Sequence, residues 1–350
     1  MITSELHFEK PILAALRGKV QHIPPVWLMR QAGRYLPEYR QTREQAGGFL
    51  QMAYNPPIAA DITLQPIRRF SMDGAILFSD ILIIPDAFGR NLRFEAGEGP
   101  RLDPLHLDDV ASLKDNLRLE KLSLVAEAVR ECRQLLAQEK FEHVTLLGFC
   151  GSPWTVACYM IDGKGGDFAH ARNWAEQHPE KLDQLIDSLV EASYSYLCMQ
   201  IEAGAEAVQL FDSWAGLLDE QGFERFVTMP TIKLVKKLKQ THPQIPVIGF
   251  PRGAGSKIVD YAARTGVDCV ACDTDVPLDL MLELQKHCCV QGNLDPLTLL
   301  EGGEKLVEQV KEICNALKNG PFIFNLGHGV IKETDPQNVA AIIATIREKS

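Results

Sequence analysis

The sequence predicts an α/β protein of the (β/α)8 TIM-barrel type, and three observations lead to this prediction. The chain has 350 residues, which is long for one ordinary domain but normal for a single α/β barrel. Eight short runs are hydrophobic throughout, as expected for parallel strands that are covered on both faces. Helical patterns separate these runs, and such alternation with eight strands indicates a barrel.

Each element of this prediction has its own sequence signal. The candidate strands are the apolar runs 26–29, 75–78, 144–149, 207–211, 246–250, 268–273, 288–293 and 322–326. Residues 179–204 have a helical pattern that ends at Gly204. A second helical pattern has Ser256 as its N-cap and Gly266 as its stop.

Segment 89–102 does not fit the alternation of strands and helices. Its glycines and weak alternation predict a β-hairpin inserted after the second strand, where it would cover one face of the barrel. No Pro/Ser-rich linker divides the chain, so we expect residues 1–350 to form a single (β/α)8 barrel domain.

The composition limits the class of protein and its partners. The formal net charge of −10 argues against nucleic acid as a general partner, although a cleft can still hold a basic pocket for an acidic small molecule. No stretch approaches the roughly 20 apolar residues of a membrane span, and we expect no signal or transit peptide and no membrane partner. Nine scattered cysteines indicate reduced thiols in a cytoplasmic protein.

The sequence contains no strong signal for a metal or a phosphate-binding cofactor. Cys269 and Cys272 have the C-x-x-C spacing, but in a strand their side chains point to opposite faces and cannot share a metal ion. The run HCC at 287–289 fits core packing. There is no GxxxxGK[ST] motif, and GKGG lacks the strand-turn-helix context of a dinucleotide loop. We therefore expect no metal and no cofactor.

Chemistry in this fold is carried at the C-terminal ends of the strands, so the strand assignment locates candidate functional residues. The polar or charged residues that follow the strands are Arg30, Arg34, Ser79, Asp80, Asp212, Ser213, Arg252 and His328. Arg30 and Arg34 share a glycine-containing loop that suits a substrate with more than one carboxylate. The alternative is a surface loop whose arginines pair with Glu38 or Glu44.

Three further residues each have a structural and a functional interpretation. Asp80 lies in the apolar stretch GAILFSDILIIP, where a buried carboxylate needs hydrogen-bond donors. It is either a structural aspartate that caps a helix or meets an arginine, or a fixed anion aimed at N–H donors or developing positive charge. His328 stands between glycines that allow a ligand close approach, although a single histidine is more often simply hydrogen-bonded in place. Tyr159 could offer a hydroxyl to a carboxylate or serve as an amphipathic core residue.

Eight motifs in register carry a resemblance to a known family. They are PVWLMRQAGRYLPEYR, LQPIRRF, FSDIL, GSPWT, YMIDG, FDSWAG, QGNLDP and NLGHGV. In this order they resemble the uroporphyrinogen decarboxylase family, from about residue 7 to about residue 348. The resemblance implies a distorted barrel, a homodimer with facing active-site clefts, and no cofactor or metal. It also implies the reaction, in which four acetate side chains of uroporphyrinogen III lose CO2 to give coproporphyrinogen III in haem biosynthesis.

The resemblance further implies which residues act. Catalytic roles would fall on Asp80, Arg30 and Arg34. Substrate contacts would come from Arg30, Gln31, Ala32, Gly33, Arg34, Asp80, Tyr159, Ser213 and His328. In the implied chemistry a pyrrole ring protonated at carbon takes up the electrons left by decarboxylation. Asp80 would accept hydrogen bonds from the pyrrole N–H groups and stabilise this cation.

Two departures and two alternatives accompany the resemblance. The segment CDTDV around Asp273 lacks the tryptophan that many relatives carry, and Trp214 stands where animal members have histidine. A corrinoid-dependent methyltransferase of the same superfamily would need zinc bound by His and Cys at strand ends, and FPRGAG and NLGHG contain no cysteine. A tetrapyrrole carrier without activity would keep the arginine loop but would not need Asp80.

Overall fold

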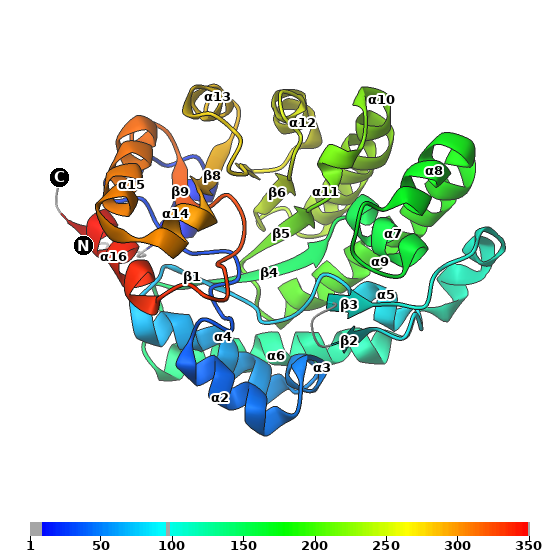
Figure 1. Ribbon diagram of the computed structural model, residues 1–350, viewed down its shortest axis with the longest axis horizontal. Helices are drawn as coiled ribbons and strands as arrows, with labels where there is room; N and C mark the ends of the chain where they lie inside the picture. Colours follow the sequence, from blue (N-terminus) through cyan, green and yellow to red (C-terminus); the bar gives the residue numbers. More distant parts are fainter. Residues whose placement is uncertain (1–8, 96–98, 349–350) are drawn as a thin grey trace, which may run out of the picture.

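The computed structural model describes residues 9–95 and 99–348, and in this part of the chain seven parallel strands form one sheet (Figure 1). In sheet order the strands are β1 (Gly74–Ile76), β4 (Thr145–Gly151), β5 (Ala207–Asp212), β6 (Val247–Pro251), β7 (Cys269–Ala271), β8 (Cys289–Leu294) and β9 (Phe322–Leu326). Each corresponds to a predicted run, with ends that differ by at most two residues. Helices surround the sheet, as parallel strands joined by crossover helices require.

The segment 25–29 closes this sheet into a barrel between β9 and β1. Val26 forms a parallel bridge with Phe324 of β9, whose N–H donates to the carbonyl of Pro25 at 2.9 Å. On the other side, Asp73 precedes β1 and donates its N–H to the Val26 carbonyl at 2.9 Å. The predicted (β/α)8 barrel is therefore confirmed, with 25–29 as a distorted eighth stave, that is, the eighth position in the closed ring of strands.

The prediction of a regular strand at 26–29 is wrong, because side chains replace the backbone ladder along this stave. The Asp73 carboxylate accepts the Val26 N–H at 2.7 Å. The side-chain oxygen of Asn325 accepts the Met29 N–H at 2.9 Å. Polar side chains that compete for backbone donors interrupt strand pairing, and an apolar run in the sequence does not reveal this competition.

The inserted hairpin is confirmed. β2 (Arg93–Glu95) and β3 (Gly99–Arg101) pair in antiparallel fashion, while positions 96–98 of the predicted hairpin lie outside the described residues. Phe94 of β2 contacts the ring of Phe49 at a centroid distance of 4.6 Å, and Phe49 contacts Phe78 at 5.2 Å. These rings attach the hairpin to the chain that leaves the end of β1.

The helices form the outer layer and their ends follow the sequence signals. They are α1 (Pro11–Leu16), α2 (Pro37–Ala46), α3 (Phe49–Ala53), α4 (Pro56–Phe70), α5 (Ile83–Ala87), α6 (Leu119–Gln138), α7 (Pro153–Asp162), α8 (Ala169–Gln177), α9 (Pro179–Ala203), α10 (Glu220–Phe223), α11 (Met229–Thr241), α12 (Lys257–Thr265), α13 (Leu278–Leu284), α14 (Pro296–Glu301), α15 (Gly303–Leu317) and α16 (Pro336–Arg347). The predicted stops are confirmed at Gly204 after α9 and at Gly266 after α12. Ser256 occupies the N-cap position of α12 without a side-chain capping bond. Within the described ranges, no helix combines the length and apolar character that crossing a bilayer requires.

The inside of the barrel is packed separately from the layer between strands and helices. Helix α1 inserts its apolar face at the N-terminal end of the barrel. The inner cluster comprises Ile12, Ala15, Leu16, Trp27, Met29, Leu147, Ala207, Ile248, Phe250, Cys269, Ala271, Cys289 and Ile323. Cys269 belongs to this inner cluster and Cys272 to the outer one, so the prediction that their thiols lie on opposite faces is confirmed. All nine cysteines are free.

A chain of buried polar side chains crosses the barrel next to the plug that α1 and the inner cluster form. The Trp27 indole N–H donates to Gln291 Oε1 at 3.0 Å, and Gln291 Nε2 donates to Gln209 Oε1 at 3.1 Å. The three side chains come from different staves and are fully buried. The barrel is therefore closed beneath its C-terminal end.

At the N-terminal ends of the strands, acidic side chains are held by both backbone donors and cations. Asp73, Glu206 and Asp268 directly precede β1, β5 and β7. They accept backbone N–H groups from the preceding stave, at Val26 (2.7 Å), Leu146 (3.0 Å) and Val247 (2.7 Å) respectively. They also form ion pairs with Arg347 (2.6 Å), Lys10 (2.7 Å) and Lys239 (2.7 Å). Carboxylates at this end thus link neighbouring staves.

Candidate active site

The C-terminal ends of the staves bring most of the predicted site residues to one end of the barrel. In stave order these are Arg30 after segment 25–29, Asp80 after β1, Tyr159 on the helix after β4, Ser213 after β5, Arg252 after β6 and His328 after β9. Arg30 interacts electrostatically with Asp80, Tyr159 and His328, which places these four side chains in one neighbourhood. Residues that lie far apart in the sequence therefore meet at the barrel mouth, where this fold carries its chemistry.

The arginine loop has a backbone that is fixed from below. Arg30 is exposed and has a left-handed backbone with φ of 59°, a conformation that costs energy in a residue with a side chain. Gln31 directly follows and is fully buried, with its Oε1 accepting the Leu28 N–H at 3.0 Å and its Nε2 donating to the Gly74 carbonyl at 2.9 Å. The Gln31 side chain thus anchors the loop to β1, and it holds Arg30 in a strained position.

Arg34 is exposed at the other end of the same loop. The alternative of pairing with Glu38 does not hold, because Glu38 forms a bidentate pair with Arg69 at 2.7 and 2.8 Å. Arg34 forms no ion pair with Glu44 or with any other described residue. Between the two arginines, Ala32 and Gly33 are half-buried. The loop therefore presents two guanidinium groups that form no ion pair with a carboxylate of the described residues.

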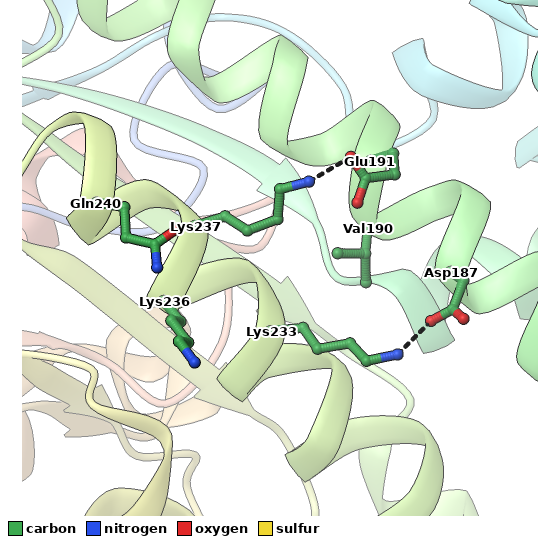
Figure 2. A pocket seen from close by; sticks show the side chains of 7 residues that line it. All are labelled: Asp187, Val190, Glu191, Lys233, Lys236, Lys237 and Gln240. Atoms are coloured by element: carbon green, nitrogen blue, oxygen red, sulfur yellow. Dashed lines mark hydrogen bonds and ion pairs between the residues drawn. The ribbon is translucent and has the colours of Figure 1, made fainter.

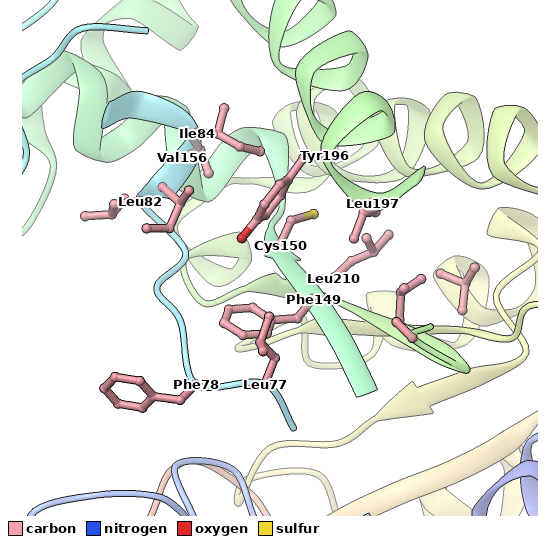
Figure 3. Packing of buried hydrophobic residues seen from close by; sticks show 14 of the residues in the cluster. Leu77, Phe78, Leu82, Ile84, Phe149, Cys150, Val156, Tyr196, Leu197 and Leu210 are labelled. Atoms are coloured by element: carbon pink, nitrogen blue, oxygen red, sulfur yellow. The ribbon is translucent and has the colours of Figure 1, made fainter. Parts of the chain in front are cut away.

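Asp80 is half-buried in an apolar environment at the end of β1. Figure 3 shows Leu77, Phe78 and Leu82 among the buried side chains around this segment. Asp80 Oδ1 accepts the Leu82 N–H at 2.8 Å in a local turn just before α5, so one oxygen has a structural partner although α5 has no side-chain capping bond. The carboxylate forms no ion pair with any residue in the described ranges, and Oδ2 makes no hydrogen bond there. Desolvation raises the pKa of Asp80 to about 6, against the opposing effects of the Leu82 N–H and Arg30.

The two glycines beside His328, Gly327 and Gly329, are tightly packed against neighbouring residues. A Cβ at Gly327 would collide with the backbone and hydroxyl of Thr274, and a Cβ at Gly329 would collide with the Arg30 side chain. Burial lowers the pKa of His328 to about 4, with help from Arg30 and Arg252. The imidazole is therefore neutral at physiological pH and can donate a hydrogen bond without adding charge.

Tyr159 and Ser213 complete the set of predicted residues. The Tyr159 ring packs edge-on against Phe168 at 5.1 Å and near Trp214 at 6.5 Å, so it does have an aromatic packing role. Burial raises its pKa, and its hydroxyl stays protonated. Ser213 is half-buried beside Trp214, and its hydroxyl makes no hydrogen bond to a described residue. Both hydroxyl groups thus lie near the mouth of the barrel.

Two strand-end residues were recognised in the sequence but assigned no role. Asp212 is buried, and its Oδ1 accepts the Thr155 hydroxyl at 2.6 Å, while that hydroxyl accepts the Trp214 N–H at 3.0 Å. Burial raises the pKa of Asp212 to about 7. Arg252 is half-buried at the end of β6 and acts electrostatically on His328. Their position after β5 and β6 was the available signal in the sequence for both.

The floor of the mouth is apolar. Phe149, Phe211 and Phe250 follow one another on β4, β5 and β6, with edge-to-face contacts at 5.5 Å and 6.0 Å between ring centroids. Such a floor excludes water beneath a bound ligand and strengthens the electrostatic effect of the charged groups at the rim.

A groove on the outer helices differs from this site in both place and charge. Figure 2 shows that it lies between α9 and α11, where Lys233 pairs with Asp187 at 2.6 Å and Lys237 pairs with Glu191. Two of the three lysines that line the groove are therefore neutralised by carboxylates in the same groove. The mouth of the barrel remains the candidate active site.

Comparison with known proteins gives the family of sequences that the chain matches. Residues 8–349 match the profile of the family described as uroporphyrinogen decarboxylase (URO-D). A protein of Paracoccus denitrificans named uroporphyrinogen decarboxylase is 51% identical over 343 residues, which cover 97% of this chain and 99% of that one. A protein of the same name from Chelativorans sp. is 50% identical over 341 residues, covering 97% and 98%.

Solved structures support the fold. A methyltransferase from Methanosarcina mazei superposes with a TM-score of 0.79 at 21% identity and covers 97% of both chains. A B12-independent methionine synthase from Shewanella sp. W3-18-1 gives a TM-score of 0.55 at 11% identity, covering 93% of this chain and 96% of that one. At these identities the likeness concerns the barrel and carries no information about the reaction.

Proposed function

We infer the reaction from the premise that the chain belongs to the uroporphyrinogen decarboxylase family. It is a carboxy-lyase of porphyrin and haem biosynthesis. The reaction removes CO2 from the four acetate side chains of uroporphyrinogen III and yields coproporphyrinogen III. The remaining question is how the residues at the barrel mouth perform it.

Decarboxylation leaves an electron pair on the side-chain carbon, and this pair needs an acceptor. A pyrrole ring that has been protonated at carbon is a cation next to the acetate. When the bond to CO2 breaks, the electron pair moves into this ring and leaves an exocyclic methylene group. A proton then adds to the methylene carbon to form the methyl group, and the ring carbon releases the proton that it took up first, which restores the pyrrole. The substrate therefore supplies its own electron sink, and the enzyme has to stabilise a positive charge on the pyrrole.

Asp80 is the residue that we propose for this task. Its carboxylate has one oxygen bonded to the Leu82 N–H and a second oxygen without a hydrogen-bond donor among the described residues, and it lies at the mouth of the barrel. Pyrrole N–H groups of the substrate would supply the missing donors and would partly replace the water that burial removes. A preorganised contact of this type typically lowers a barrier by about 3–4 kcal/mol. The free oxygen of Asp80 is the observation that carries the proposed mechanism.

The remaining predicted residues would hold the carboxylates of the substrate. Arg30 and Arg34 present unpaired guanidinium groups, and His328 presents a neutral imidazole. Tyr159 and Ser213 would donate from their hydroxyl groups. The oxygen and the nitrogen of the Gln31 side chain are both hydrogen-bonded within the protein. The substrate contacts that we propose for Gln31, Ala32 and Gly33 would therefore be made by the backbone. We propose that one of the arginines, or water bound to it, relays protons.

Three properties of the whole molecule belong to the same proposal. The chain would act as one barrel domain over residues 1–350, without metal or cofactor. It would work in the cytoplasm, where its free thiols would stay reduced. It would form a homodimer with facing clefts, as the family resemblance implies.

The test is to incubate the purified protein with uroporphyrinogen III under anaerobic, chelator-treated conditions and to follow the products by chromatography. Stepwise appearance of hepta-, hexa-, penta- and tetracarboxylate products would support the proposal. Binding without CO2 loss would refute it in favour of a carrier. Activity that depends on stoichiometric zinc would refute it in favour of metal chemistry.

A further inference from the structure

The arginines in the described part of the chain differ in burial and in partners. Several on the outer helices are neutralised: Arg68 binds Glu139 at 2.7 Å, Arg225 binds Asp183 at 2.5 Å, and Arg264 binds Glu224 at 2.6 Å. At the mouth of the barrel, Arg252 forms no ion pair with any described residue, like the two arginines of the 30–34 loop. In a protein with a formal net charge of −10, an unpaired guanidinium that is half-buried calls for an anionic partner from outside.

The stave order places Arg252 across the mouth from Arg30. The barrel runs from segment 25–29 through β1, β4 and β5 to β6, and returns through β7, β8 and β9. Arg30 follows the first stave and Arg252 the fifth, so four steps separate them in either direction. Both act electrostatically on His328, so both guanidinium groups lie near that side chain. Asp80 follows the second stave, beside Arg30.

The backbone of Arg252 is fixed independently of its side chain. Its N–H donates to the Asp212 carbonyl at 3.0 Å, and its carbonyl accepts the Gly216 N–H at 3.0 Å. The next residue, Gly253, has φ of +75° and donates its N–H to Asp273 Oδ2 at 2.6 Å. A Cβ at Gly216 would collide with the backbone of Gly253, so the two turns pack directly against each other. The side chain is thus presented from a rigid turn, as precise ligand recognition requires.

We propose that Arg252 binds a peripheral carboxylate of the tetrapyrrole on the side opposite the 30–34 loop. This inference rests on the proposed function, because it takes uroporphyrinogen III as the ligand. The substrate carries acetate and propionate groups all around its ring. A ring centred on Asp80 and held at one edge only would be free to tilt, whereas two guanidinium groups on opposite sides fix its plane over the apolar floor. Arg252 is accordingly a substrate-binding residue that orients the ring and does not take part in proton transfer.

The test compares Arg252→Gln with Arg130→Gln in steady-state kinetics with uroporphyrinogen III. Arg130 lies exposed on α6 and forms no ion pair with a described residue, so its variant removes the same charge away from the mouth. We expect Arg252→Gln to raise KM by roughly 10-fold to 100-fold and to change kcat by less than about 3-fold, because a binding contact common to ground state and transition state is lost. Arg130→Gln should match the unmodified protein. Fluorescence titration with uroporphyrin should show the same loss of affinity for Arg252→Gln without any chemistry.

The outcomes separate this inference from the function on which it rests. An Arg252→Gln variant with KM and uroporphyrin affinity within about twofold of the unmodified chain would overturn the inference alone. If the unmodified chain does not decarboxylate uroporphyrinogen III, both fall. Should Arg252→Gln fail to fold, Arg252→Lys replaces it: loss of the bidentate fork should raise KM at least about 3-fold, and an unchanged KM would count against the inference.

Discussion

The two ends of the same barrel use the same types of charged residue for different purposes. At the N-terminal end, Asp73 precedes β1, accepts the Val26 N–H and pairs with Arg347 at 2.6 Å. At the C-terminal end, Asp80 follows β1, accepts one backbone N–H and has no cation within bonding distance among the described residues. The two carboxylates are seven residues apart in the sequence and are electrostatically satisfied to different degrees.

This difference separates stability from function along a single strand. A carboxylate with a full set of donors lowers the energy of the folded protein and has nothing left to offer a ligand. A carboxylate with a free oxygen raises the energy of the folded protein and recovers that cost when a ligand supplies donors. The same holds for cations, since Arg347 is paired and Arg30 is not. Unsatisfied charge at one end of a fold is therefore a physical marker of a binding site.

The largest expected effect is on catalysis at the C-terminal end. Asp80→Asn keeps the shape and the acceptor for the Leu82 N–H but removes the negative charge that stabilises the pyrrole cation. We expect kcat to fall by about 100-fold to 1,000-fold with little change in folding. Coproporphyrinogen formation and far-UV circular dichroism measure the two effects. Turnover near the unmodified level would show that Asp80 has no electrostatic role.

A smaller effect, of the opposite kind, is expected at the N-terminal end. Arg347→Ala leaves the buried Asp73 carboxylate with the Val26 N–H and without its cation. We expect the free energy of unfolding to fall by about 1–3 kcal/mol, while kcat and KM at 25 °C stay within about twofold. Urea denaturation and initial rates measure these quantities. A variant that keeps its stability and loses activity would invert the contrast between the two ends.

The pH dependence of activity probes the same contrast without mutation. If ionised Asp80 is required, kcat/KM should decline below a pKa of about 6, by about tenfold per pH unit. His328 does not contribute in this range, because its pKa is about 4. Asp212, with a pKa of about 7, is the competing assignment. An acid limb that disappears in Asp212→Asn would transfer the role to that residue.

The last expected effect concerns stability at the C-terminal end and appears only at high pH. The folded pKa of Asp80 is about 6, above its usual value of 3.8, so its ionised form opposes folding. This penalty is absent below about pH 4, grows as the pH rises to 6 and is complete above 7. Asp80→Asn should therefore be more stable than the unmodified protein by up to about 3 kcal/mol at pH 8, and the difference should nearly vanish at pH 4. Thermal unfolding at both values tests this, and a variant less stable at pH 8 would contradict it.

The fold was predictable because its signals are local. Seven of the eight apolar runs form strands, and the antiparallel pair of β2 and β3 and the stops at Gly204 and Gly266 lie where glycine and periodicity indicated. The eighth run, 26–29, failed as a strand because Asp73 and Asn325 take its backbone donors. Both residues are distant in sequence, so no local pattern could contain that information.

The candidate site was predictable in position and partly in composition. The strand-end rule selected Asp80, His328 and the arginine loop, and the comparisons support the family to which these motifs belong. The sequence did not reveal that Gln31 serves as an internal anchor, since its partners Leu28 and Gly74 meet it only in the folded state. It also could not show that Glu38 pairs with Arg69, which leaves the neighbouring Arg34 without that partner. Which charges remain unpaired is a property of packing.

The plug formed by α1 and the polar chain from Trp27 to Gln209 give the barrel a sealed base. Substrate, carbon dioxide and product must therefore all pass through the open C-terminal end of the barrel, and each polypeptide has one Asp80 there. Four acetates on one macrocycle must come to that single carboxylate in turn. Between successive steps the macrocycle has to rotate in place or leave and return. Because α1 and the polar chain close the other end of the barrel, partly decarboxylated rings can enter and leave only through this opening.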